Sequence, residues 1–79
     1  MMAKIHYLKI EPQYYKEVFL GHKTFEIRKN DRDFKVGDDV ILQEYISSKR
    51  EYTGNQLARE ITYITDYAQH EDYVVFSIQ

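Results

Sequence analysis

The sequence predicts an α+β domain in which one helix follows the first of five strands, and the strands form a small, mainly antiparallel, partly closed β-barrel. Three observations support this fold class. Alternating apolar and polar segments recur along the chain, one segment has the spacing of an amphipathic helix, and 79 residues leave room for only one small core. Closing the sheet would hide strand edges that a flat sheet leaves exposed.

The composition indicates one domain, residues 1–79, from a reducing compartment. The chain has no cysteine, so we expect no disulfide or thiolate metal site and a cytoplasmic location. No apolar run reaches the length of a signal-peptide core or a membrane span. Residues 1–35 carry eight basic and five acidic side chains, whereas residues 36–79 carry three and eight. This asymmetry favours a local anion site over a broad surface for duplex nucleic acid.

The first two predicted elements are a strand and a helix. Residues 5–10 alternate as a strand, and Pro12 suits the first turn of the helix predicted over residues 11–20. The apolar residues of this helix follow the spacing of one buried face. They are Tyr14, Tyr15, Val18 and Phe19. Gly21 is expected to cap the helix in a left-handed conformation, which places Lys23 at the start of the next strand.

Charged residues crowd the stretch from residue 21 to residue 33, yet the second predicted strand, residues 23–29, still alternates. Its apolar parity contains Phe25 and Ile27, and its polar parity contains Thr24, Glu26, Arg28 and Asn30. We therefore expect the apolar pair to be buried and the polar set to line a pocket. Residues 30–33 form either a turn that caps its own backbone or a rim that brings Arg32 to that pocket.

Three further strands complete the predicted order β-α-β-β-β-β. A turn at residues 36–39 precedes a third strand over residues 40–46, and residues 47–55, which include Gly54, are expected to form an exposed connection. Residues 57–67 alternate as a long fourth strand. After a polar loop, residues 73–78 form a fifth strand. Its apolar residues Val74, Phe76 and Ile78 share one parity.

The motif residues resemble those of a known superfamily. Gly21, Lys23, Glu26 and Arg28 follow the pattern Gly-x-Lys-x-x-Glu-x-Arg of the ASCH superfamily, whose fold is related to the PUA barrel. A subfamily of small bacterial and phage ASCH proteins of unknown function is closer still. The resemblance to that subfamily lies in His6-x-Leu8-Lys9, the run Arg28 to Arg32, Tyr52-Thr53-Gly54 and Tyr73-Val74-Val75. It covers nearly the whole chain and implies a PUA-like barrel with a ligand cleft between helix and barrel.

This resemblance implies RNA or a nucleotide-like anionic ligand as the partner, because ASCH domains are proposed to bind RNA or to act in RNA-linked processes. The expected ligand-binding residues are His6, Lys9, Lys23, Glu26, Arg28, Asn30 and Arg32. Their chemistry suits such a ligand: Arg28 can hold a phosphate or carboxylate in a fork while Glu26 accepts from a base amine. Alternatively, these side chains pair with one another and only order the cleft.

A second hypothesis is an amidohydrolase, since one branch of small bacterial ASCH proteins deacetylates N4-acetylcytidine with a lysine, a threonine and a glutamate. Lys23 matches the lysine, but Glu26 stands in the place of the threonine, two residues beyond Thr24. Glu44 or Glu60 would have to supply the glutamate. The catalytic candidates are therefore Lys23, Glu26 and Thr24, and binding is favoured over catalysis.

Other classes of site are not indicated. His6, His22 and His70 lack the helical spacing and the cysteine partners of a metal site, so neither a metal nor a cofactor is expected. Exposed tyrosines can stack on bases, although strand tyrosines are more often part of a core. A third hypothesis is a protein-interaction module with an inert cleft. A monomer or a weak dimer is expected.

Overall fold

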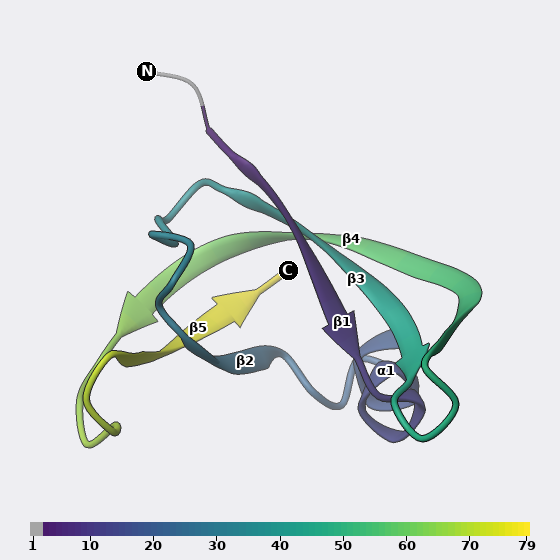
Figure 1. The fold of residues 1–79 in the computed structure, drawn as a ribbon. Helices are drawn as coiled ribbons and strands as arrows, with labels where there is room; N and C mark the ends of the chain where they lie inside the picture. The colour runs from purple at the N-terminus through teal and green to yellow at the C-terminus, as the bar shows by residue number, and fades with distance from the viewer. Residues whose placement is uncertain (1–2) are drawn as a thin grey trace.

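The computed structural model describes residues 3–79; residues 1 and 2, which the sequence places in the same domain, lie outside the described range. The elements are β1 (Ile5–Ile10), α1 (Pro12–Phe19), β2 (Phe25–Lys29), β3 (Asp39–Ile46), β4 (Glu51–Thr65) and β5 (Tyr73–Ile78) (Figure 1). The predicted order of one helix after the first strand and four strands after the helix is confirmed.

The five strands form one mixed sheet in the order β1-β3-β4-β5-β2. β1 runs parallel to β3, and the other three pairings are antiparallel, so the prediction of a mainly antiparallel sheet is confirmed. β4 is long and bends, so that its first part pairs with β3 and its last part with β5 (Figure 1). β1 and β2 are the two edges of the sheet, which is not closed into a barrel.

The start of β4 differs from the sequence prediction. β4 begins at Glu51, inside the stretch predicted to be an exposed connection, and only residues 47–50 remain as a tight turn. Gly54 has a left-handed φ of +96°, but it lies within the strand, close to an irregularity in the pairing between Gln43 and Tyr45. A glycine inside a strand often marks such an irregularity.

The start of β2 is also later than predicted. Gly21 ends α1 with a left-handed φ of +80°, as expected. The chain then stays bound to the helix end, because the amides of His22 and Lys23 both donate to the carbonyl of Glu17. Lys23 therefore belongs to the helix cap rather than to the strand, which begins at Phe25.

The core lies on one face of the sheet, and α1 packs at one end of it, beside the ends of β1 and β3 (Figure 1). Val74, Phe76 and Ile78, which share one parity of β5, are all buried. Only half of the predicted helix face packs: Val18 is buried and Tyr15 packs against the core, whereas Tyr14 and Phe19 are largely exposed. α1 has only about two turns and lies at the end of the sheet. The sheet therefore covers only part of the apolar face of the helix.

The faces of β2 are opposite to the prediction. Glu26 is only 5% exposed, while Phe25 and Ile27 are 43% and 51% exposed. The pairing with β5 explains this reversal, because Glu26 lies opposite Phe76 and residues directly opposite each other in an antiparallel pair share a face. Phe76 points into the core, so the polar parity of β2 is the inward one.

A buried polar cluster joins β1 to the turn before β3. Asp38 is 4% exposed, and its carboxylate accepts hydrogen bonds from the backbone amides of Lys4 and Lys35, each at 3.0 Å. His6 Nε2 lies 2.8 Å from Asp38 Oδ2. Burial alone raises the pKa of Asp38, but the hydrogen bonds from His6, Lys4 and Lys35 outweigh it and hold the pKa below its ordinary value.

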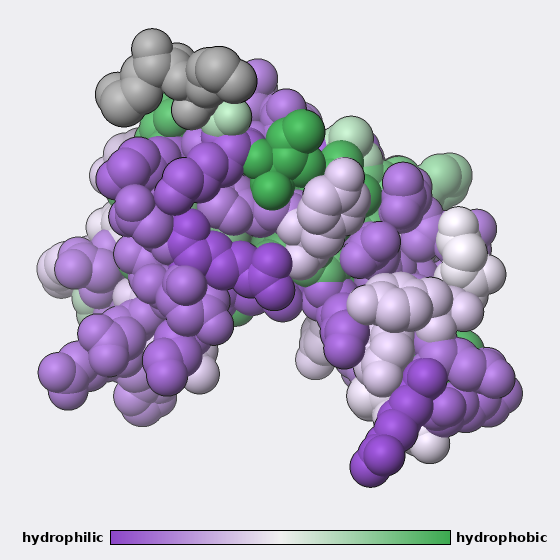
Figure 2. Space-filling model, turned by 45° about the horizontal axis from the view of Figure 1, so that its top comes forward, coloured by the Kyte–Doolittle hydropathy of each residue, from purple (hydrophilic) through white to green (hydrophobic). Residues whose placement is uncertain are grey.

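The outer surface is mostly hydrophilic on the face shown in Figure 2, where scattered hydrophobic groups stand among polar ones and the surface is indented between two lobes. Within residues 3–79, no helix has the length and hydropathy needed to cross a membrane.

Candidate functional site

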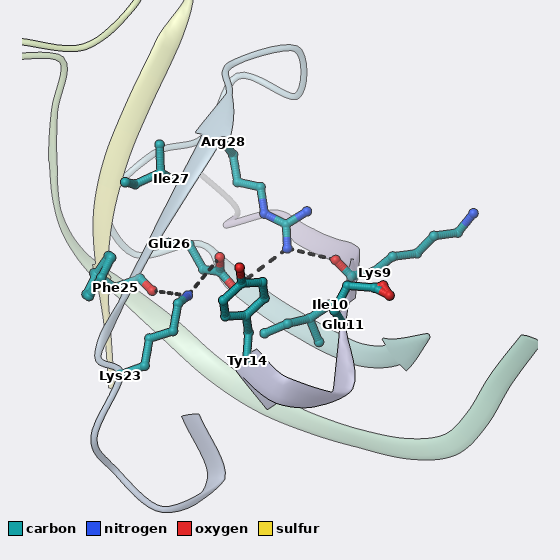
Figure 3. Close-up of a pocket in the computed structure, with 9 residues that line it drawn as sticks. All are labelled: Lys9, Ile10, Glu11, Tyr14, Lys23, Phe25, Glu26, Ile27 and Arg28. Carbon is teal, nitrogen blue, oxygen red and sulfur yellow. Dashed lines mark hydrogen bonds and ion pairs between the residues drawn. The ribbon is translucent and has the colours of Figure 1, made fainter. Parts of the chain in front are cut away.

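A cleft of about 530 Å³ opens between α1, the end of β1 and the inward face of β2 (Figure 3). Its lining residues come from these three elements, from the residue between β1 and α1, and from the segment that joins α1 to β2. They are Lys9, Ile10, Glu11, Tyr14, Lys23, Phe25, Glu26, Ile27 and Arg28. The cleft therefore brings together four of the seven predicted ligand-binding residues: Lys9, Lys23, Glu26 and Arg28.

Glu26 presents a buried carboxylate to this cleft from the middle of β2. Its Oε2 lies 3.2 Å from Lys23 Nζ. Its Oε1 lies 3.6 Å from Arg28 Nη2, which is an ion pair but too long for a hydrogen bond. Among residues 3–79, Oε1 has no hydrogen-bond partner, although it is buried. A buried carboxylate oxygen without a donor is destabilising, so this atom has an acceptor position left for a ligand.

Both the backbone amide and the side-chain ammonium of Lys23 form hydrogen bonds. Its backbone amide is bound in the helix cap, and its ammonium donates to the carbonyl of Phe25 at 2.7 Å. The ammonium also lies 5.0 Å from the centre of the Phe25 ring, within the range of a cation-π contact. An ammonium has three donors; the carbonyl of Phe25 takes one of them, and Glu26 lies beside the ammonium as an ion pair. One donor beside Glu26 is left for a ligand.

Arg28 and Arg32 join the two edges of the sheet. Arg28 Nη2 donates to the carbonyl of Lys9 at 2.8 Å, and Arg32 Nη1 donates to the carbonyl of Tyr7 at 2.9 Å. Both acceptors belong to β1, while Arg28 belongs to β2 and Arg32 follows it. β1 and β2 have no ladder of backbone hydrogen bonds between them, and the two guanidinium groups bind carbonyls of β1 across this gap.

Lys9 contributes to the cleft differently from the expectation. Its carbonyl accepts from Arg28, but its side chain leaves the cleft in Figure 3. The ammonium lies 4.4 Å from the centre of the Tyr45 ring, and Tyr45 packs edge-on against Tyr52 at 4.9 Å. The charge of Lys9 is thus directed toward the aromatic pair on β3 and β4 rather than toward Glu26.

The other predicted ligand-binding residues do not line the cleft. His6 is buried with Asp38 and packs edge-on against Phe34 at 4.7 Å. Asn30 Oδ1 accepts from the amide of Phe34 at 3.0 Å, which corresponds to the backbone-capping alternative for this turn. Arg32 lies beside a separate, smaller cavity.

The residues considered for the missing catalytic positions also lie outside the cleft. Thr24 is exposed, and its carbonyl accepts from the amide of Ile78. Glu44 accepts from the Thr53 hydroxyl at 2.6 Å, near the turn between β3 and β4, and Glu60 is exposed on β4. Of the three catalytic candidates, the structure brings Lys23 and Glu26 together and leaves Thr24 apart.

Two lining aromatics, Tyr14 and Phe25, are absent from the residues expected to bind a ligand. The helical and strand patterns place both on buried faces. Phe25 lies between the candidate residues Lys23 and Glu26 in the sequence. This position is the sequence feature that could have placed it beside the cleft. Nothing local distinguishes Tyr14 from its neighbour Tyr15, which packs against the core instead.

The comparisons with known proteins cover every element of this fold. Residues 5–78, from the first residue of β1 to the last residue of β5, match the family described as "Domain of unknown function (DUF3850)". The chain is also similar to the "Uncharacterized 12.9 kDa protein in GpA 3'region" of Escherichia phage P2. The two are 41% identical over 76 residues, which are 95% of this chain and 68% of the phage protein. The chain therefore belongs to the DUF3850 family of domains of unknown function.

Proposed function

We propose that this protein binds RNA or a nucleotide-like ligand and that a nucleobase occupies the cleft beside Glu26. The observation that carries the proposal is the buried Glu26 Oε1, which has no hydrogen-bond partner among residues 3–79. An exocyclic amine of a base would supply the missing donor. The cleft of about 530 Å³ falls within the range of roughly 300–1,000 Å³ that is usual for small-molecule sites.

The polar groups of the cleft fit one edge of a base. Glu26 Oε1 offers an acceptor, and the remaining N–H of Lys23 offers a donor close to it. An amine next to a ring nitrogen or carbonyl, as in cytosine or adenine, complements such a pair. Tyr14 adds an aromatic ring to the wall of the cleft, which suits the face of an unstacked base.

The ASCH and PUA-like assignment is part of this proposal. It is supported by the meeting of Lys23, Glu26 and Arg28 around a cleft between helix and sheet, where the resemblance expects the ligand. The two arginine bridges between β1 and β2 support a barrel-like arrangement with a seam in place of a ladder. The cytoplasmic location and the monomeric or weakly dimeric state belong to the same proposal.

Deacetylation of a modified pyrimidine nucleoside is the second candidate, and the contact between Lys23 and Glu26 at 3.2 Å is the observation that favours it. In that reaction water would replace the base amine at the acetyl carbonyl and acetate would be released. Lys23 would assist this hydrolysis, with Glu26 as its charged neighbour. The position of Thr24 outside the cleft weighs against it, since the related enzymes use a threonine. Binding is therefore the better supported function.

Calorimetric titration with a mixed-sequence single-stranded RNA and with the four ribonucleosides tests the proposal. Wild-type protein is expected to bind at least one of them saturably. Glu26→Gln should bind at least about tenfold more weakly, because it replaces a charge-assisted hydrogen bond by a neutral one and adds an amide N–H that meets the base amine donor-to-donor. Lys49→Gln is the matched control, because it removes a charge from the exposed turn between β3 and β4 and should bind as wild type.

The other outcomes separate the alternatives. Release of acetate from N4-acetylcytidine, lost in Lys23→Met, would establish the second candidate. An absence of RNA and nucleoside binding, with no acetate released, would refute the proposal. It would leave a protein-interaction module, for which the exposed Phe25 and Ile27 on the outer face of β2 are the observation in favour.

A further inference from the structure

A second cavity, of about 190 Å³, lies on the seam between β1 and β2. Its lining residues are Leu8, Arg28, Lys29, Asp31, Arg32 and Phe34. Arg28 lines both this cavity and the larger cleft. The seam cavity is smaller than the roughly 300 Å³ at which sites for whole small molecules begin, so it suits a single chemical group of a larger ligand.

The two guanidinium groups at this cavity have donors to spare. A guanidinium carries five N–H donors. Within residues 3–79, Arg32 makes one hydrogen bond, to the carbonyl of Tyr7, and Arg28 makes one, to the carbonyl of Lys9. These bonds fix the positions of both groups while leaving most of their donors unused. Fixed guanidinium groups with free donors are the usual basis for recognition of phosphate.

The local charge also favours an anion. Both arginines bind neutral carbonyls, and Arg32 forms no ion pair within the described residues. Arg28 is partly balanced by Glu26 at 3.6 Å. Lys29 and Asp31 also line the cavity, so its cationic residues outnumber its acidic one by three to one. The carboxylate of Asp31 weakens the attraction for an anion but does not reverse it.

We propose that the seam cavity binds a phosphate group, and that Arg28 links it to the base in the cleft so that one nucleotide occupies both. The phosphate site stands by itself, and only the claim that one nucleotide occupies both cavities rests on the proposed function. A free phosphate and the phosphate of a nucleotide would meet the same two arginines, and the experiment distinguishes these two sources. The ligand of the cleft is accordingly a nucleotide or a nucleic acid strand rather than a free nucleoside.

The first arm of the test uses inorganic phosphate alone, followed by the NMR signals of the arginine Nε–H groups. Saturable shifts of the Arg28 and Arg32 signals are expected in wild type and in Glu26→Gln. Arg32→Gln should weaken the affinity at least about tenfold, since it removes one charged donor group, while Lys49→Gln should leave it unchanged. Shifts that do not saturate, or that are equally strong in Arg32→Gln, would overturn the phosphate site.

The second arm compares each ribonucleoside with its 3′- and 5′-monophosphate by calorimetry. One monophosphate should bind at least about tenfold more tightly than its nucleoside in wild type, and this advantage should disappear in Arg32→Gln. Saturable shifts of the arginine signals with inorganic phosphate, combined with no tighter binding of either monophosphate, would refute a single ligand that occupies both cavities. If phosphate binds but RNA, nucleosides and nucleotides do not, the proposed function fails and the phosphate site stands.

Arg32 also holds the seam, so the variants need a check on folding. Wild type and Arg32→Gln are compared by thermal melting before either titration. Arg32→Lys is the second variant, because it keeps the charge and loses the fork. It should recover less than half of the affinity lost in Arg32→Gln, and full recovery would contradict recognition by a guanidinium fork.

Discussion

Two carboxylates are buried in this small domain, and their surroundings differ. Asp38 has partners on both oxygens: the amide of Lys4 on Oδ1, and the amide of Lys35 with His6 on Oδ2. Glu26 has a lysine at 3.2 Å from Oε2, and its Oε1 has no hydrogen-bond partner within residues 3–79. Asp38 lies in the closed core, whereas Glu26 lies at the wall of an open cleft.

The difference separates a structural role from a binding role. A buried charge is tolerated when its hydrogen bonds are complete, and Asp38 meets this condition with groups from its own chain. Glu26 meets it only in part, so its burial is not explained by the stability of the fold. A buried polar atom without a partner calls for an explanation, and a ligand in the cleft would supply one.

The largest expected effect is the loss of stability in Asp38→Asn. The substitution removes the charge that His6 faces and places an amide group against backbone donors. We expect it to lower the free energy of unfolding by about 3 kcal/mol, the usual cost of breaking a buried charged network. Urea denaturation measures this value. A loss below about 1 kcal/mol would mean that Asp38 is no more structural than Glu26.

Acidification should reproduce this loss in the wild type. The pKa of folded Asp38 lies below its ordinary value of 3.8, so the unfolded chain binds the proton more readily as the pH falls. The contribution of Asp38 to stability is therefore complete above about pH 5, and it decreases as the pH falls through 3.8 toward the lower folded value. Urea denaturation at several pH values checks this.

The control for the pH dependence is Asp38→Asn, in which this part of the slope should be absent. A wild type and a variant with parallel stability curves between pH 5 and pH 3 would contradict the assignment. Carboxylates away from this cluster contribute equally to both curves, so the difference between them reports Asp38 together with its partner His6.

The sequence predicted the element order and the meeting of Lys23, Glu26 and Arg28, because strand alternation, helical spacing and the Gly21 cap are local signals. It did not predict which face of β2 is inward. Alternation defines two faces without assigning either to the core, and the pairing of Glu26 with Phe76 makes that assignment. Such a pairing joins residues 50 positions apart in the chain, which no local pattern reports.

The same limit explains the positions of His6 and of the two arginines. His6 was expected at the cleft from its place on the first strand, but its partner Asp38 is 32 residues away. Arg28 and Arg32 were expected to face a ligand, and their bonds to the carbonyls of β1 depend on which strands form the sheet edges. Strand order is a property of the whole fold.

A moderate effect is expected for Arg32→Gln. The bond from Arg32 to the carbonyl of Tyr7 joins two sheet edges that have no ladder between them. Its loss should lower the free energy of unfolding by about 1 kcal/mol, the typical value for one hydrogen bond. Hydrogen exchange should also rise in β1 and β2 more than in β4. Uniform exchange across all strands would contradict a seam at this place.

The smallest effect on stability is expected for Glu26→Gln, in contrast to Asp38→Asn. The partners of Glu26 keep other contacts, since Lys23 and Arg28 both donate to backbone carbonyls and their side chains are 17% and 26% exposed. We expect the free energy of unfolding to change by less than about 1 kcal/mol. A loss as large as that of Asp38→Asn would give both carboxylates the same structural role.

One titration compares the two carboxylates directly. A short mixed-sequence single-stranded RNA is added to the protein while the carboxyl carbons of all Asp and Glu side chains are followed by NMR. The proposed function predicts that the Glu26 signal shifts saturably with RNA and that the Asp38 signal stays in place. Saturable binding with no shift of the Glu26 signal, or no binding at all, would contradict the assignment of Glu26 to the ligand.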